Sequence, residues 1–549
     1  MGVNQMKKTK AIINIVEEGG WKICGKNKEK LYIKGYFYNK SYNQVLNDFC
    51  SLKEYDINDY LNSLDGCFSL VFETDGFVLV AVDKICSIPL FYTEIGNTWA
   101  VDSHAPSLIK RAQITELNFD AILALKMSGY TINKDTIYKG LKTLTAGERI
   151  IFKDNKIPDV CRYYQYQPWN VINNTKELCK KELAKVTLNI LRKIIKDLCG
   201  RQVIIPLSAG NDSRLIASGL RYLGYKNVKC YSYGIKGNFE SEIAKKISNK
   251  LGYEFKFIPL TVKNEKKFYK SKEFREYLNF ADTCIATQYI QSLSTIKYLK
   301  EMGWINRDAV FINGNSGDFI SGGHTTELMK SIDKSMFKNT RQDKIFDTII
   351  SKHYSLWGYL KTKKNLDNIK QQLLNEMPEK ITTPDKDHGI YEYSEFINRQ
   401  SKYVISGQRA YEFYGYEWRL PLWDIEYLKF WEGVPAKYKN NQNLYVEMLK
   451  NENWGGVWGD DIPVNNKTLR PLWIIPLRFL FKMPFSLFGN RGRDWWHQFD
   501  INVFYYWMDG TRMTCNINYI RSLFDLVKKP QNHVSWQVED YLDKKDINV

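Results

Sequence analysis

In its central third the chain alternates short apolar runs with segments of helical periodicity. The apolar runs at 202–207, 228–233 and 254–260 have the length of buried strands. Segments 215–223 and 240–251 carry apolar residues at helical spacing, and each is followed by a glycine. Strand–helix–strand–helix–strand over about sixty residues predicts an α/β fold with a doubly wound parallel sheet, whose ligands bind outside the carboxyl ends of the strands.

The loop between the first strand and the first helix of this pattern, 206–214, indicates a phosphate-binding site. A helix that begins after a loop of small residues directs free backbone N–H groups and its positive dipole end at one point. Ser208 adds a hydroxyl, Gly210 permits close approach of the backbone, and Asp212 is suited to hold the Mg²⁺ that accompanies a polyphosphate. The same loop also fits an ordinary turn in which residues 211–213 cap the helix. By itself it leaves both interpretations open.

A second glycine-rich segment, 311–324, favours the nucleotide interpretation. It follows the apolar run 309–312 and carries Asp318, a second hard oxygen ligand. Two glycine loops with one aspartate each are what a site that holds two ends of a triphosphate through Mg²⁺ requires. His324 ends the segment, where it either contacts a substrate or is simply packed.

These segments resemble motifs of the asparagine synthetase family. Leu207–Arg214 resembles the Ser-Gly-Gly-x-Asp-Ser loop of asparagine synthetases, β-lactam synthetases and related AMP-forming amide ligases. Asn313–Gly323 is similar to the family's second loop, and Tyr416–Asp424 resembles its Glu-x-Arg-x-Pro-x-x-Asp segment. The resemblance implies a PP-loop domain over 175–470, of the adenine nucleotide alpha hydrolase type, with a helical insertion near 326–400. Within the third motif, Glu417 and Arg419 are more typical of a structural pair than of catalytic groups.

Residues 1–160 resemble the glutaminase-type domain that precedes the synthetase domain in this family. Apolar strands at 64–72, 78–83 and 88–92 are separated by turns rich in glycine and aspartate. Such a pattern predicts a layered, mostly β domain. The resemblance implies an α+β domain of the Ntn-hydrolase type.

The sequence nevertheless lacks the groups that a glutaminase of this type uses. Its nucleophile is an N-terminal cysteine, whereas residue 2 is Gly2 and the nearest thiol is Cys24. The family's Asn-Gly-Glu segment reads Lys34–Tyr36 here, and the arginine expected before Asp83 is Val82. We therefore expect that glutamine hydrolysis is lost, and that the domain is a structural relic or a docking surface.

The resemblance also implies a reaction and a role for each site residue. A carboxylate attacks the α-phosphorus of ATP, pyrophosphate leaves, and ammonia or an amine then displaces AMP. We assign Mg²⁺ to Asp212 and Asp318. We assign the nucleotide contacts to Leu207, Ser208, Gly210, Asp212, Ser213, Tyr233 and Gly314. The catalytic set is Lys467, facing the tetrahedral intermediate, and Asn315, which replaces the glutamate of the family's Gly-Glu-Gly and, as an amide, is unable to act as a general base.

Three functions fit these residues. The first is an ATP-dependent amide ligase for a small acid or a sugar uronic acid, such as one in surface polysaccharide synthesis, with nitrogen supplied as ammonia or an amine, free or from a partner glutaminase. The second is a peptide cyclase or a β-lactam synthetase-like ligase. The third is a non-catalytic ATP-binding relative, but the retention of Ser208, Asp212, Ser213 and Asp318 argues against it.

Composition adds limits on partners and location. The formal net charge of +18 favours phosphorylated or acidic partners. The lysines form no stripe interleaved with aromatic residues, so nucleic acid is the weaker interpretation. The ten cysteines are scattered singly, without a Cys-x-x-Cys pair, and the sequence shows no secretory signal peptide. This pattern favours reduced thiols and a cytoplasmic protein.

The C-terminal extension, 471–549, is aromatic and basic. Its first part, 471–488, is strongly apolar but is interrupted by Pro476 and Pro484 and contains Arg478 and Lys482. It is too short and too interrupted to span a bilayer. It either packs on the preceding domain or makes a peripheral contact with a membrane interface.

Overall fold

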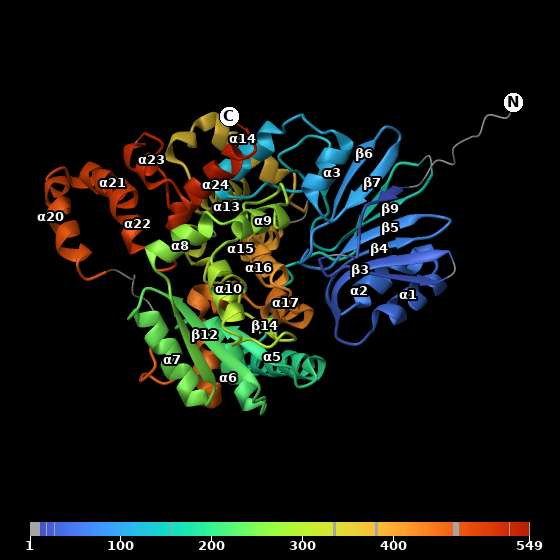
Figure 1. The fold of residues 1–549 in the computed structure, drawn as a ribbon, viewed down its shortest axis with the longest axis horizontal. Helices are drawn as coiled ribbons and strands as arrows, with labels where there is room; N and C mark the ends of the chain where they lie inside the picture. The colour runs from blue at the N-terminus through green and yellow to red at the C-terminus, as the bar shows by residue number, and fades with distance from the viewer. Residues whose placement is uncertain are drawn as a thin grey trace.

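The structure, a computed structural model, has three parts: an N-terminal layered domain, a central parallel-sheet domain and a projecting group of C-terminal helices (Figure 1). It describes residues 11–17, 19–26, 28–154, 156–332, 336–378, 383–464, 471–525 and 527–547.

Two sheets form the middle layers of the N-terminal domain. The larger sheet is antiparallel with the order β10-β9-β5-β4-β3-β2, and the smaller has the order β1-β7-β6-β8. The strands of the larger sheet are β2 (Lys22–Lys26), β3 (Glu29–Phe37), β4 (Gly66–Glu73), β5 (Val78–Val82), β9 (Glu148–Phe152) and β10 (Asp159–Arg162). Those of the smaller sheet are β1 (Ala11–Ile13), β6 (Phe91–Ile95), β7 (Thr98–Asp102) and β8 (Lys142–Thr143).

Strand β5 shows why these layers form. Its side chains alternate between two faces, and both faces are buried. Val78, Val80 and Val82 belong to the core that contains residues of the smaller sheet, whereas Leu79 and Ala81 pack with the helices on the outer face. The helices of the two outer layers are α1 (Tyr42–Ser51), α2 (Ile57–Ser63), α3 (Ala105–Ala112) and α4 (Phe119–Ser128). This helix–sheet–sheet–helix arrangement confirms the layered α+β domain that the sequence predicts.

The central domain begins with the long helix α5 (Lys176–Leu198) and contains a five-stranded sheet. All of its strand pairs are parallel, in the order β13-β12-β11-β14-β15. The strands are β11 (Val203–Pro206), β12 (Val228–Gly234), β13 (Glu254–Pro259), β14 (Val310–Ile312) and β15 (Glu417–Arg419). The strand order reverses between β11 and β14, so the crevice at their carboxyl ends is the switch point where such sheets bind ligands. The doubly wound parallel sheet is thereby confirmed.

Helices cover this sheet and extend from it toward the N-terminal domain (Figure 1). The first group is α6 (Asn211–Tyr222), α7 (Phe239–Leu251), α8 (Val262–Tyr269), α9 (Lys272–Phe280) and α10 (Leu293–Glu301). Residues 326–395 form α12 (Thr326–Ser331), α13 (Lys338–His353), α14 (Lys363–Leu374) and α15 (Asp387–Glu395). Ile345 and Ile369 of this second group share a core with Met127 of α4, so these helices are anchored on the N-terminal domain.

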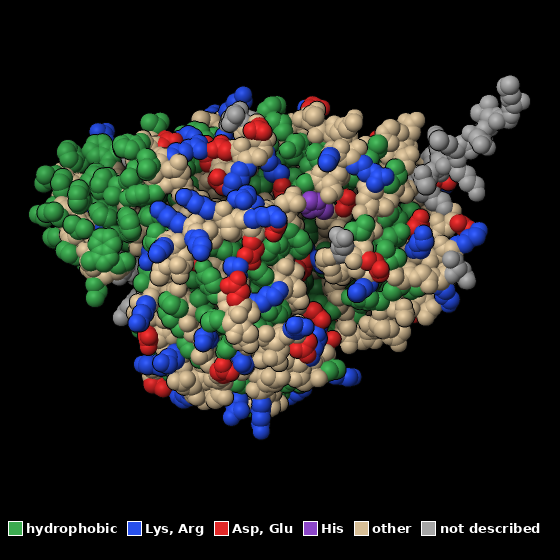
Figure 2. Space-filling view, in the orientation of Figure 1, with side chains coloured by type: hydrophobic (Ala, Val, Ile, Leu, Met, Phe, Trp, Pro, Cys, Tyr) green, Lys and Arg blue, Asp and Glu red, His purple; other side chains and the backbone are tan. Residues whose placement is uncertain are grey.

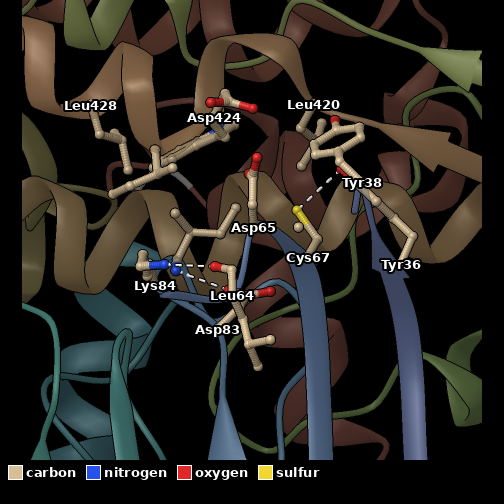
Figure 3. Close-up of a pocket in the computed structure, with 14 residues that line it drawn as sticks. Tyr36, Tyr38, Leu64, Asp65, Cys67, Asp83, Lys84, Leu420, Asp424 and Leu428 are labelled. Carbon is tan, nitrogen blue, oxygen red and sulfur yellow. Dashed lines mark hydrogen bonds between the residues drawn. The ribbon is translucent and has the colours of Figure 1, made fainter. Parts of the chain in front are cut away.

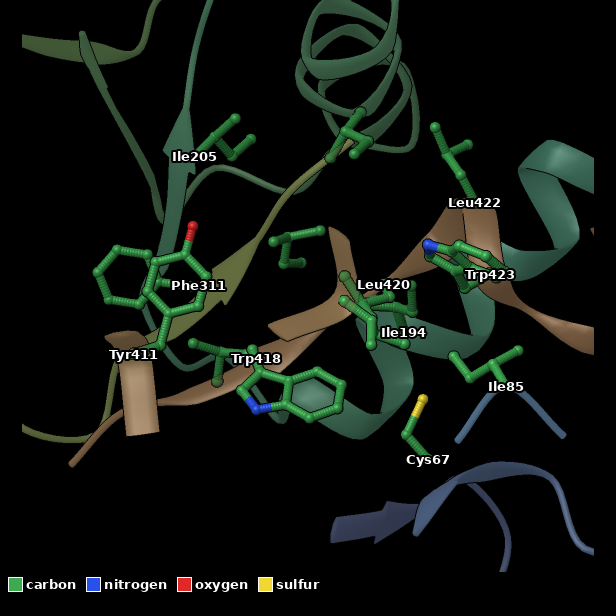
Figure 4. Packing of buried hydrophobic residues seen from close by; sticks show 14 of the residues in the cluster. Cys67, Ile85, Ile194, Ile205, Phe311, Tyr411, Trp418, Leu420, Leu422 and Trp423 are labelled. Atoms are coloured by element: carbon green, nitrogen blue, oxygen red, sulfur yellow. The ribbon is translucent and has the colours of Figure 1, made fainter. Parts of the chain in front are cut away.

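One hydrophobic core joins the two domains. Figure 4 shows Cys67 and Ile85 of the N-terminal domain beside Leu420 and Trp423 of the central domain. All four side chains are buried. Because this contact is apolar and solvent-excluded, we expect the two domains to behave as one unit.

The C-terminal helices divide into a docked part and a projecting part. Helix α24 (His533–Asp543) packs on α4 through Trp536 and Tyr541. Helices α20 (Ile474–Ser486) and α21 (Gly489–Phe499) project from the body of the molecule, and within α20 only Ile474 is buried (Figure 1). In the described parts of the chain, we find no helix with the length and apolar character needed to cross a bilayer.

Candidate functional site

The loop between β11 and α6 is built as an open helix N-terminus. Gly210 is the N-cap residue of α6, so no cap side chain occupies the space in front of the first helical N–H groups. The Ser208 N–H donates to Oγ of Ser213 over 3.0 Å, and the Gly210 N–H donates to Oγ of Ser208 over 3.1 Å. These bonds fix the loop from within and leave the helix dipole directed at the space above it.

The second glycine loop touches the first at Asp212. A Cβ atom on Gly314 would lie 2.6 Å from the Asp212 carbonyl carbon, and one on Gly317 would lie 2.4 Å from Asp212 Oδ1. Only glycine permits this approach. The Asp318 N–H donates to Asp212 Oδ2 over 3.2 Å, and the Tyr445 hydroxyl donates to Oδ1 over 2.9 Å. The two aspartates that follow β11 and β14 are therefore held together at the switch point of the sheet.

The electrostatics of this pair fit a divalent cation. Burial, together with the negative charge of Asp318, raises the pKa of the Asp212 carboxyl above its ordinary value. A cation that contacts both carboxylates would remove this repulsion. No group of three or more His, Cys, Asp or Glu side chains suited to a metal occurs in the described residues. Two aspartates completed by phosphate oxygens and water are a usual Mg²⁺ environment, so these residues fit the ion.

His324 connects Asp318 to a buried carboxylate. Its Nε2 lies 3.1 Å from Oδ2 of Asp318, and its Nδ1 lies 2.6 Å from Oε1 of Glu395. Burial opposes the charged imidazolium, but the negative charge of Glu395 and the hydrogen bonds to both carboxylates raise the pKa of His324 to about 9. His353 and Arg399 also contact Glu395, at 3.2 and 3.1 Å. His324 is therefore a protonated support that orients Asp318.

Two adjoining cavities lie above these loops. The larger, of about 860 Å³, is lined by all seven residues that the sequence assigns to the nucleotide: Leu207, Ser208, Gly210, Asp212, Ser213, Tyr233 and Gly314. The smaller, of about 440 Å³, is lined by Asp318, Arg399 and Gln400. Asn315 lines both cavities and so lies at their junction. Lys467 is outside the described residues; Val464, nearby in sequence, lines the smaller cavity.

Arg214 is a supporting residue that sequence reasoning missed. It is buried, and its guanidinium donates to the carbonyl oxygens of Ala209 and Ile462, both over 2.8 Å, and of Pro463 over 3.1 Å. These hydrogen bonds connect the loop between β11 and α6 to residues 462–463, which precede Lys467 in the sequence. The sequence also does not decide whether His324 contacts a substrate or is packed, because its partner Glu395 is 71 residues distant in the sequence. The sequence does carry a signal for Arg214, because an arginine is unusual on the apolar face of a helix, here in its first turn.

Glu417 and Arg419 have structural partners. Arg419 is buried and contacts Asp197 at 2.6 Å and Glu417 at 3.0 Å. Its guanidinium carbon lies 3.9 Å from the ring centre of Tyr36 in the N-terminal domain. This agrees with the interpretation of the pair as structural, and it places Arg419 at the boundary between the two domains.

A small pocket at this boundary is lined by Tyr36, which stands where the resembled family has the glutamate of its Asn-Gly-Glu segment (Figure 3). It is lined by Tyr36, Cys67 and Asp83 and has a volume of about 20 Å³, room for about one water molecule. The Asp83 carboxylate accepts hydrogen bonds from the N–H groups of Phe68 and Ile85, at 2.8 and 2.9 Å. Burial raises the pKa of the Cys67 thiol, so this sulfur is not an activated nucleophile.

An αββα domain joined to a parallel sheet with two contacting aspartates at its switch point fits an ATP-dependent ligase of the amidotransferase class. The comparisons with known proteins agree. Residues 36–165 match the model of the glutamine amidotransferase domain, and residues 199–451 match that of asparagine synthase. The chain belongs to the asparagine synthetase-like family of carbon–nitrogen ligases.

Similarity to individual proteins is remote. No curated protein matches the chain. Among solved structures, glutamine phosphoribosylpyrophosphate amidotransferase from B. subtilis, complexed with ADP and GMP, is 13% identical over 45% of this chain and 75% of its own, with a TM-score of 0.18. A structure of the allosteric regulatory enzyme of purine biosynthesis is 12% identical over 53% of this chain and 55% of its own, also with a TM-score of 0.18.

Proposed function

We propose that this protein is an AMP-forming amide ligase that adenylates a substrate carboxylate and transfers ammonia or an amine to it. The observation that carries the proposal is the contact between Asp212 and Asp318 at the switch point of the sheet, directly below two adjoining cavities. Two carboxylates held in contact can bind one cation together, and that cation can also contact two phosphates of one nucleotide.

The two cavities suggest how the reactants are arranged. In our proposal ATP occupies the larger cavity, with its phosphates over the N-terminus of α6 and its adenosine between Leu207 and Tyr233. The carboxylate occupies the smaller cavity, where Arg399 and Gln400 supply donors. The reacting α-phosphorus then lies at the junction, beside Asn315.

The chain's residues act mainly by positioning and by neutralising charge. Asp212 and Asp318 would hold Mg²⁺, which supplies positive charge to the departing pyrophosphate. A carboxylate oxygen attacks the α-phosphorus, and the bond to pyrophosphate breaks. The nitrogen then attacks the acyl carbon, the bond to AMP breaks, and the surplus proton on nitrogen passes to water as AMP leaves. We assign to Lys467 the stabilisation of that tetrahedral intermediate, and to Asn315 a hydrogen bond to the acyl group or the nitrogen, since an amide does not accept the proton.

We also propose that the N-terminal domain has lost glutaminase activity and now supports the ligase domain. Lys34, at the family's amide-binding asparagine, forms a buried ion pair with Glu412, and Tyr36, at the family's glutamate, stacks with Arg419. The pocket beside Tyr36 has space for about one water. Nitrogen then enters as free ammonia, as an amine, or from a partner glutaminase.

The size of the smaller cavity favours a substrate larger than a simple amino acid. Its volume of about 440 Å³ lies in the range of sites for drug-sized ligands. A sugar uronic acid, free or nucleotide-linked, fits this size and the donors at Arg399 and Gln400, as it would in surface polysaccharide synthesis. A peptide carboxylate, as in a cyclase or a β-lactam synthetase-like ligase, is the alternative.

Carboxylate-dependent exchange of labelled pyrophosphate into ATP tests this proposal. We expect exchange with Mg²⁺ and a uronic acid, abolished by EDTA and absent without a carboxylate. Aspartate, nucleotide-linked uronic acids and a peptide carboxylate should be compared in parallel, because the active compound identifies the substrate class. Release of ADP in place of AMP in the complete reaction would contradict the proposal, and failure to bind ATP would favour a non-catalytic relative.

A further inference from the structure

The projecting C-terminal helices expose a dense group of apolar side chains. Figure 2 shows them as a continuous hydrophobic region at one end of the molecule, over α20 and α21. We call this group the apolar tip; it consists of Leu472, Trp473, Ile475, Leu477, Phe479, Leu480, Phe481, Met483, Leu487, Phe488 and Trp495, all exposed. Exposed apolar regions of this extent mark interaction sites.

Exposed apolar side chains extend around α20 except along one stripe, Ile474, Arg478 and Phe485, that packs against the following helices. Phe479, Leu480 and Phe481 are consecutive, so they point in directions about 100° apart, and all three are exposed. Leu487, about two turns further on, is 84% exposed. A helix that packs on a protein buries one stripe, and α20 already does so; the apolar side chains on its other faces need an apolar medium around them. This distribution favours a lipid phase over a second protein surface.

The apolar tip is a folded unit that holds these side chains outward. Trp496, Phe504 and Met508 form a small core with Ile474 at its base. Arg478 forms a two-pronged ion pair with Asp500, at 2.7 and 2.6 Å. Because helix α20 is fixed to the following helices by these contacts, its exposed residues are a permanent surface of the fold.

The charges around the apolar tip match an anionic surface. Apart from the Arg478–Asp500 ion pair, residues 471–500 contain three Lys or Arg side chains, Lys482, Arg491 and Arg493, against one acidic residue, Asp494. Tryptophan at 473 and 495 adds the side chain that is enriched at the level of lipid headgroups. With 13 residues, α20 is about 20 Å long, shorter than the ~30 Å hydrocarbon core, so it would lie in the interface and not cross it.

From these observations we propose that the apolar tip inserts into the headgroup region of an anionic lipid bilayer and anchors the protein peripherally. Apolar side chains with flanking cations are what such binding uses. Leu472, at the base of the tip, and Gly510 and Thr511, which follow α22 (Tyr505–Met508), also line the larger cavity. Insertion of the tip therefore places the rim of that cavity close to the bilayer surface.

Vesicle sedimentation tests the proposal without any assumption about the reaction. The full-length protein is mixed with phosphatidylcholine vesicles that contain or lack one quarter phosphatidylglycerol. We expect binding to the anionic vesicles, weakened at high salt, with a blue shift of tryptophan fluorescence. The triple variant Phe479→Ser, Leu480→Ser, Phe488→Ser should lower the partition coefficient at least tenfold. The variant Lys482→Gln, Arg491→Gln, Arg493→Gln should lower it several-fold, on anionic vesicles alone.

The matched control is the double variant Phe119→Ser, Ile157→Ser, which removes two exposed apolar side chains from the N-terminal domain. It should bind vesicles as the wild type does. Circular dichroism and thermal melting verify that each variant is folded. Failure of the wild type to bind anionic vesicles overturns the proposal. So does unchanged binding by the triple serine variant. A wild-type dimer that this variant dissociates, without vesicle binding, would assign the surface to a second copy of the chain.

Discussion

Lys34 Nζ lies 2.6 Å from Oε2 of Glu412, in an ion pair that is buried on both sides and joins the two domains. Glu412 also contacts Arg409 at 2.9 Å and accepts a hydrogen bond from the Trp418 indole at 2.9 Å. By the resemblance, Lys34 stands at the asparagine of the family's Asn-Gly-Glu segment. A residue type that would disable a glutaminase therefore has a structural role here.

This arrangement predicts an asymmetric cost for breaking the pair. Glu412→Gln leaves Lys34 buried without a countercharge and should lower the free energy of unfolding by about 3–5 kcal/mol. Lys34→Met leaves Glu412 with Arg409, so its cost should be smaller. Urea titrations of both variants measure the difference. Glu54→Gln, which breaks the exposed pair with Lys153, is the control, with an expected change below about 1 kcal/mol. If Glu412→Gln and Lys34→Met lowered the free energy of unfolding equally, Lys34 would not depend on Glu412 as its countercharge.

Asp212→Asn should abolish pyrophosphate exchange and leave the fold intact. The variant removes a proposed Mg²⁺ ligand, and the loss of one preorganised charge in such a site typically costs about 10²–10³-fold in rate. The repulsion with Asp318 also disappears, so the thermal midpoint of the free protein should not fall. Asp461→Asn, which alters an exposed aspartate paired with Lys250, should exchange at the wild-type rate. Wild-type exchange by Asp212→Asn would remove the basis of the proposed site.

Gly317→Ala tests the contact between the two loops. The added Cβ would lie 2.4 Å from Asp212 Oδ1 and 2.7 Å from Leu422 Cδ1, so the loops would have to separate. We expect weaker ATP binding, by at least tenfold in isothermal titration. Gly76→Ala is the matched control, because its Cβ would meet only Thr74 Oγ1 at an ordinary 3.7 Å. If the two variants bind ATP alike, the loops do not form the nucleotide site together.

His324 should make stability depend on alkaline pH. Its pKa in the folded protein, about 9, lies above its ordinary value near 6.5. The stabilisation it provides is therefore complete below pH 6.5 and is lost as the pH rises through 9. The difference in unfolding free energy between the wild type and His324→Gln should shrink by on the order of 3 kcal/mol between pH 6.5 and 9.5. A difference that grows with pH would show that the imidazole is neutral in the fold.

The sequence alone determined the strands β11, β12 and β13 and the helices α6 and α7, because each has a complete local signal; it did not predict β15. The apolar runs 202–207, 228–233 and 254–260 became β11, β12 and β13, and the glycines after residues 223 and 251 lie just beyond the ends of α6 and α7. The seven residues that the sequence assigns to a nucleotide line one cavity, because the carboxyl ends of parallel strands meet at the same edge of a sheet.

Only the tertiary structure decided which distant residues act together. The Asp318–His324–Glu395 chain and the contacts of Arg214 with 462–463 join segments whose sequence separation carries no periodic signal. The apolar residues of α20 do not show whether other parts of the protein cover this helix. A helix buried in protein and a helix that faces lipid have the same composition. The fold resolves this by placing α20 away from both domain cores, where only Ile474 is shielded from solvent.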